Sequence, residues 1–135
     1  MGGMPVHPQM VHFPVAFLSG ACGFYMLYAW FGGERFRWTA WYCHILGLAT
    51  MLPALITGIA ARAQVQGVAP GWLDRHQTMG IGTGVYFLLL WVIFLQRPNW
   101  MRRRGMVTLL GIIGIALVWV TSVYGNTIVW RWLCD

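Results

Sequence analysis

Apolar residues dominate four long stretches of the chain, and polar residues gather in the short segments between them. Each stretch is long enough for an α-helix that crosses the hydrocarbon of a bilayer, which takes roughly 20 residues. The stretches cover about residues 8–31, 38–61, 74–96 and 106–130. Since the connections are short, successive helices are expected to run antiparallel. The pattern predicts an all-α fold: one integral membrane domain, residues 1–135, built as a four-helix up-down bundle.

Composition supports this prediction. Hydrophobic residues make up 59% of the chain and charged residues only 9%, whereas a soluble domain carries roughly 25% charged residues. The net charge of +6 comes from arginines that interrupt the apolar stretches. They do not form a basic stripe, so the expected surroundings are membrane lipid and no nucleic acid is expected to bind. The cysteines contain no C-x-x-C pair, which argues against a covalently attached c-type haem.

The arginines also predict an orientation. Six lie in the first and third connections, and three lie at the opposite ends of the helices: Arg35, Arg37, Arg97, Arg102, Arg103 and Arg104 against Arg62, Arg75 and Arg131. Basic residues accumulate on the cytoplasmic side of a membrane. We therefore expect a multi-pass protein of the inner (plasma) membrane with its N- and C-termini outside.

Two histidines and two prolines open the first apolar stretch, at His7–Pro14. Pro8 fits the first turn of a helix, so His7 is expected near the N-cap. Pro14 lacks the N–H of a helical hydrogen bond, so a kink is expected there. His12 lies about one turn inside the apolar layer. An ionisable side chain at that depth is costly and indicates a functional site that faces the protein interior.

His12 and His76 lie on different predicted helices, each within about one turn of the same membrane face. Two imidazoles at matching depth across a bundle are the axial ligands that a b-type haem requires. We therefore expect His12 and His76 to bind haem iron, with His7 as the substitute ligand. The alternative is a hydrogen-bonded histidine network without a cofactor, and a simple capping or hydrogen-bonding role is expected for His7. A quinone is the other candidate occupant.

Further residues at this end suit a haem. Small residues would leave room for the macrocycle, and basic residues would pair with its propionates, although small residues also serve plain helix packing. The expected cofactor-binding residues are Gly20, Gly80, Gly84, Arg62, Arg75 and Tyr124. His44 lies on the order of 20 Å away along the membrane normal, and we expect it to be a packed polar residue.

The motif His-Pro-x-x-Val-His-Phe-Pro at residues 7–14 resembles a bacterial membrane protein family catalogued as domain of unknown function 2231. The likeness extends along the chain to Thr57-Gly58, His76 and Tyr124-Gly125. The resemblance implies a small quinone- or haem-associated membrane protein that occurs beside, or fused to, redox modules. His44 and the C-terminal Trp-Arg-Trp-Leu-Cys-Asp tail are not part of the family pattern, so nothing is carried over to them.

Two functions from different classes follow. The first is an electron-transfer subunit of a membrane redox complex, which exchanges electrons with a quinol or a periplasmic cytochrome. The second is a cofactor-free structural or anchoring subunit. In both cases other subunits are expected as partners, since the tail segment Trp130–Leu133 carries large side chains suited to a groove or the bilayer interface. Catalysis of a bond-making reaction is not expected, because the chain has only three acids and none is paired with a histidine inside a span.

Overall fold

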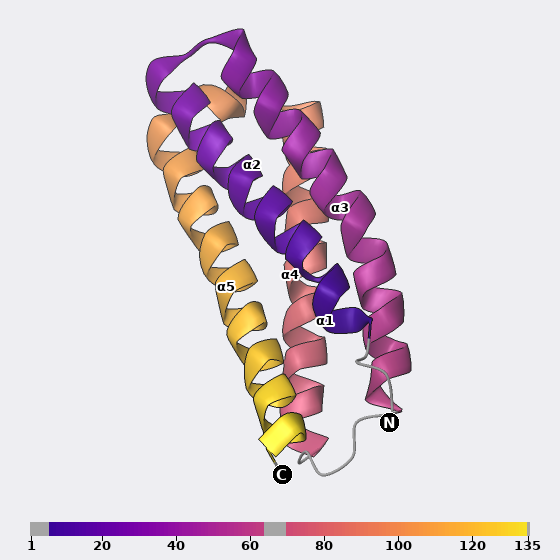
Figure 1. Ribbon diagram of the computed structural model, residues 1–135. Helices are drawn as coiled ribbons and strands as arrows, with labels where there is room; N and C mark the ends of the chain where they lie inside the picture. The colour runs from indigo at the N-terminus through magenta and orange to yellow at the C-terminus, as the bar shows by residue number, and fades with distance from the viewer. Residues whose placement is uncertain (1–5, 64–69, 135) are drawn as a thin grey trace.

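The computed structural model describes residues 6–63 and 70–134, with Pro70 and residues 132–134 described by their backbone alone. The side chains of Trp132 and Leu133, expected to suit a groove or the bilayer interface, thus lie outside the described residues. The elements are α1 (His7–Met10), α2 (His12–Phe31), α3 (Glu34–Arg62), α4 (Pro70–Gln96), the 3-10 helix η1 (Pro98–Arg102) and α5 (Arg104–Cys134). The described residues contain no strand. The predicted all-α four-helix bundle is confirmed (Figure 1).

The four long helices pack in a ring. α2 packs on α3 and α5, and α4 packs on the same two helices, with the α3–α4 interface the sparsest of the four. One end of the bundle, here called the terminal end, carries α1, the start of α4 and the ends of α3 and α5 (Figure 1). The opposite end, here called the short-loop end, carries the Gly32–Gly33 turn and η1.

All four long helices are long and apolar enough to cross a membrane, the first of them counted together with α1. Buried side chains such as Leu18, Phe87 and Phe94 fill the centre of the bundle. Large apolar side chains, among them Leu52 and Ile56, also cover its outside. Water would not tolerate so much exposed apolar surface, whereas lipid tails solvate it without cost. The surface is therefore that of a membrane protein.

A helix break separates α1 from α2 at Val11, about one turn before Pro14. Pro14 has no N–H to donate to the carbonyl of Met10, so the regular helix is interrupted there. The kink expected from the sequence is thus present as a break. α1 packs against α3, as α2 does, and His7, the first residue of α1, lies beside the end of α3.

The start of α4 differs from the sequence prediction. The third apolar stretch begins near residue 74, but α4 begins about one turn earlier, at Pro70. Proline is favoured in the first turn of a helix because its missing N–H is not needed there. Asp74 lies about one turn inside α4, where its carboxylate pairs with Arg62 at 2.6 Å. α3 starts at Glu34, ahead of the predicted boundary, and continues through Pro53.

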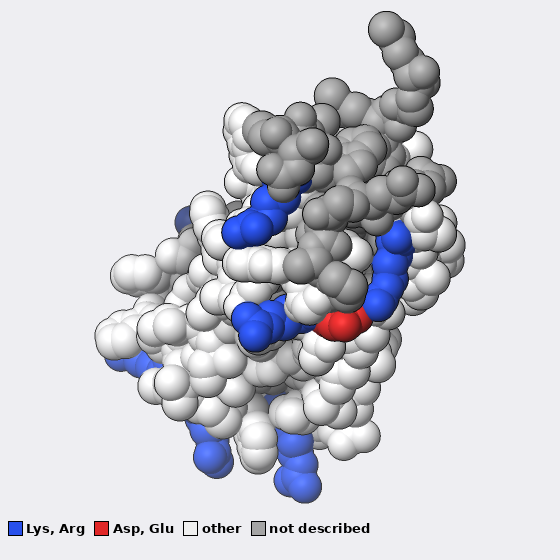
Figure 2. Space-filling model, turned by 90° about the horizontal axis from the view of Figure 1, so that it is seen from below, with Lys and Arg blue, Asp and Glu red and all other residues white. Residues whose placement is uncertain are grey.

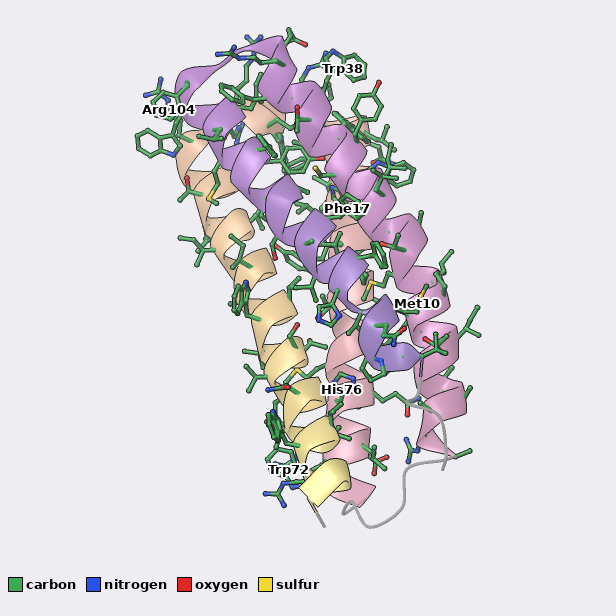
Figure 3. The ribbon with its side chains drawn as sticks, viewed as in Figure 1. Met10, Phe17, Trp38, Trp72, His76 and Arg104 are labelled. Carbon is green, nitrogen blue, oxygen red and sulfur yellow. The ribbon has the colours of Figure 1, made fainter. Side chains whose placement is uncertain are left out.

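Aromatic and basic side chains mark both ends of the bundle. Trp38 and Arg104 lie at the short-loop end, and Trp72 lies at the terminal end (Figure 3). The guanidinium of Arg104 lies over the ring of Trp30 at 5.6 Å, and that of Arg131 lies over Trp72 at 4.8 Å. Aromatic belts of this kind occur where a membrane protein meets the headgroup region.

His44 is a packed polar residue, as expected. Its side chain is fully buried between α3, α2 and α4. Nε2 lies 3.0 Å from the carbonyl oxygen of Phe87. A carbonyl can only accept, so Nε2 carries the proton and Nδ1 accepts a hydrogen bond from the Tyr25 hydroxyl at 3.1 Å. Both ring nitrogens are therefore satisfied, and His44 has no lone pair left for a metal.

Candidate functional site

Two histidine rings lie side by side, edge to face, at the terminal end. His7 comes from α1 and His76 from α4, and their ring centroids are 6.0 Å apart with an angle of 70° between the ring planes. In Figure 3, His76 lies at the level of α1. α1 lies against α3, which places His7 beside Thr57 and Gly58.

Hydrogen bonds define the tautomer of both rings. Nδ1 of His76 lies 3.1 Å from the carbonyl oxygen of Thr121, so Nδ1 must be the donor. Nδ1 of His7 lies 3.3 Å from Oγ1 of Thr57. The single hydroxyl proton of Thr57 is directed at the carbonyl of Pro53, 2.8 Å away, so this oxygen accepts from His7. In their neutral forms both rings therefore carry a lone pair on Nε2, the usual arrangement of a metal-binding histidine.

A glycine backs each ring. A Cβ added to Gly58 would lie 2.9 Å from Cε1 of His7, and one added to Gly125 would lie 2.9 Å from Cε1 of His76. Any side chain at either position would displace the ring, since carbon atoms normally approach to about 3.5–4.0 Å. The same arrangement occurs twice in the bundle. His7 lies against Thr57 and Gly58 of α3. His76 lies against Thr121 and Gly125 of α5. This repetition is not evident from the order of residues along the chain.

A cavity of about 600 Å³ surrounds the histidine pair. Apolar side chains from all four long helices form most of its lining, including Leu18, Leu55 and Val118. The ionisable side chains among its lining residues are those of His7, His12, His76 and Arg62. A mostly apolar cavity with a few convergent polar groups is typical of a cofactor or small-molecule site.

The structure places the predicted ligands as follows. His76 lies in the cavity and faces His7 rather than His12. His12 also lines the cavity, but its side chain is exposed. Of the glycines, Gly80 lines the cavity. Gly20 packs near Cys43 and Gly84 packs against Met51, and these two contribute to helix packing instead of the cavity wall.

The basic and aromatic residues predicted to bind the cofactor lie partly inside and partly outside the cavity lining. Arg62 lines the cavity and is held by Gln77 at 2.5 Å and Asp74 at 2.6 Å. Arg75 is exposed and outside the cavity lining. Tyr124 packs against Trp72, with ring centroids 5.7 Å apart. Figure 2, which looks onto the terminal end, shows separate basic patches and one acidic patch that touches a basic one.

A family model described as "Predicted membrane protein (DUF2231)" matches residues 3–133. No curated protein and no solved structure matches the chain.

Proposed function

This chain belongs to the DUF2231 family of predicted membrane proteins, and we propose that it is an electron-transfer subunit that holds a b-type haem at its terminal end. The observation that supports the proposal is the adjacent pair His7 and His76, whose ring centroids are 6.0 Å apart. A b-type haem supplies reversible one-electron exchange at an iron whose axial ligands set its potential.

The separation of the two rings would allow both to hold one metal. An imidazole nitrogen binds a metal at about 2 Å, so the centroids of two rings that shared a metal would be on the order of 6 Å apart. The observed separation is 6.0 Å. Both rings donate through Nδ1 and keep Nε2 for a metal. The residues present therefore fit the group, and the apolar cavity around them would exclude water from it.

The geometry favours His7 over His12 as the partner of His76. His12 has an exposed side chain at the cavity wall, whereas the His7 ring lies between Gly58 and His76. The pair His12 and His76 predicted from the sequence stays a competing assignment, which the variants below separate.

The surrounding residues have distinct roles in this proposal. Thr57 and Thr121 hold the proton on Nδ1 of each ring and so orient Nε2. Arg62 lines the cavity and would pair with a propionate, in competition with Asp74. If the terminal end faces outward, as the arginine distribution predicts, the partners would be a quinol in the bilayer or a periplasmic cytochrome and the other subunits of a redox complex.

The test is an absorption spectrum of the purified full chain, oxidised and then reduced with dithionite. We expect a sharp reduced α-band that is lost in His7→Ala and His76→Ala and kept in His12→Ala and His44→Ala. Loss in His12→Ala with retention in His7→Ala would instead support the pair His12 and His76. A chain expressed with added haem that shows no visible absorption would overturn the proposal.

A cofactor-free structural subunit is the second candidate. It is favoured by the same hydrogen bonds, since Thr57 and Thr121 already satisfy the Nδ1 atoms and tie α1 to α3 and α4 to α5. A flat spectrum in the wild type, together with destabilisation of His7→Ala and His76→Ala, would select it.

A further inference from the structure

A second cavity lies at the short-loop end, opposite the histidine pair. Its volume is about 520 Å³. Its lining combines the end of α2 and the Gly32–Gly33 turn with two arginines, Arg102 of η1 and Arg104 of α5. We propose that this cavity binds the phosphate headgroup of an anionic phospholipid.

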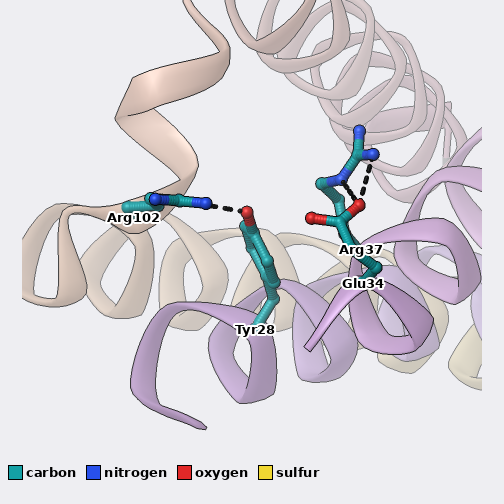
Figure 4. A network of polar contacts seen from close by, with 4 residues as sticks. All are labelled: Tyr28, Glu34, Arg37 and Arg102. Carbon is teal, nitrogen blue, oxygen red and sulfur yellow. Dashed lines mark hydrogen bonds and ion pairs between the residues drawn. The ribbon is translucent and has the colours of Figure 1, made fainter. Parts of the chain in front are cut away.

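The charge of the cavity is positive. Glu34 is the one acid in its lining, and its carboxylate is paired with Arg37 at 2.5 Å (Figure 4). Neither Arg102 nor Arg104 forms an ion pair within residues 6–63 and 70–131. Two unpaired guanidinium groups therefore line one hollow, and an anion there would face little repulsion from Glu34.

Both guanidinium groups are oriented by neighbours. Nε of Arg102 donates to the Tyr28 hydroxyl at 3.3 Å (Figure 4), which leaves its two terminal nitrogens for another acceptor. The Arg104 guanidinium lies over the Trp30 ring at 5.6 Å. Arginine binds phosphate through parallel N–H groups in a planar fork, and a fork held in place loses less conformational freedom on binding.

The surroundings favour a lipid over a soluble phosphate. Trp30 and Phe31 also line the cavity, and their side chains are 51% and 77% exposed. Trp30 is held by a hydrogen bond from its Nε1 to Thr108 at 2.9 Å. Exposed aromatic rings at the end of a spanning helix lie at the headgroup level, so acyl chains would continue along them. Basic pockets between helices on the cytoplasmic side typically receive anionic headgroups.

This proposal is independent of the haem proposal, because no residue is shared between the two cavities. Failure of either proposal leaves the other untouched.

The experiment is native mass spectrometry of the full chain with phosphatidylglycerol or phosphatidylcholine, comparing three proteins. The double variant Arg102→Gln/Arg104→Gln removes the cavity charges. The control Arg35→Gln/Arg97→Gln removes the same charge from the same end but outside the cavity lining. We expect wild type and control to retain phosphatidylglycerol preferentially, and the cavity variant to bind it on the order of tenfold more weakly.

If the cavity variant and the control bind phosphatidylglycerol equally weakly, the lipid is attracted by overall charge and the proposed site is wrong. Displacement of phosphatidylglycerol by millimolar inorganic phosphate would make soluble phosphate the ligand and overturn the lipid assignment. If the glutamine variant does not fold, Arg102→Lys/Arg104→Lys keeps the charge without the planar fork. It should lose the preference for phosphatidylglycerol, and an unchanged preference would overturn the site.

Discussion

The glycines behind the two histidines allow a test at residues that would not themselves bind a cofactor. In Gly125→Ala the new Cβ would lie 2.9 Å from Cε1 of His76, closer than the usual carbon contact of about 3.5–4.0 Å. The ring must therefore retreat from α5 by roughly 0.6–1.1 Å. Its hydrogen-bond acceptor Thr121 lies on the same helix, so the retreat stretches a bond of 3.1 Å beyond the useful range.

The expected cost is about 1 kcal/mol for that hydrogen bond and about 10- to 100-fold in haem affinity, the usual effect of disturbing a residue that orients a ligand. Gly58→Ala should act in the same way on His7, since Gly58 and Thr57 both lie on α3. The assay is haem titration of each purified variant by absorption, with thermal unfolding in detergent as a readout that needs no haem.

The matched control is Gly82→Ala on α4, where an added Cβ would meet nothing within 4 Å. It should bind haem as the wild type does and be at least as stable, since alanine is the better helix former. Wild-type haem affinity and unchanged spectra in both Gly58→Ala and Gly125→Ala would refute the assignment of His7 and His76.

Two further predictions concern the core and the orientation. His44→Leu should lower the free energy of unfolding by about 2–4 kcal/mol, because it leaves the Tyr25 hydroxyl unpaired among buried side chains. Tyr25→Phe leaves Nδ1 of His44 without its donor and should cost about 1–3 kcal/mol. Equal stability of His44→Leu and wild type in denaturant titrations would contradict the buried hydrogen bonds. A reporter fused after Asp135 should behave as external, and a fusion active in the cytoplasm would reverse the predicted orientation while leaving the four helices unchanged.

The sequence alone determined the fold class. An antiparallel helical bundle follows from three features of the sequence. These are four stretches of spanning length, too few charges for a water-facing surface, and short connections. These are properties of composition and length, so they do not depend on how the helices are rotated. The ends of the helices are harder to predict from the sequence, because a capping signal is short and neighbouring residues can carry similar signals. The third apolar stretch begins near residue 74, yet α4 begins at Pro70, a residue suited to a first helical turn.

Tertiary packing decided which polar groups meet. His7 and His12 are five positions apart, so on a continuous helix they would point in different directions. Which of them meets His76 depends on the packing of α1 against α3. The same holds for His44: its depth follows from the sequence, but its partner Tyr25 follows only from the packing of α2 on α3. Spacing along the chain gives the level of a side chain in the membrane, whereas rotation about the helix axis comes from the contacts between helices.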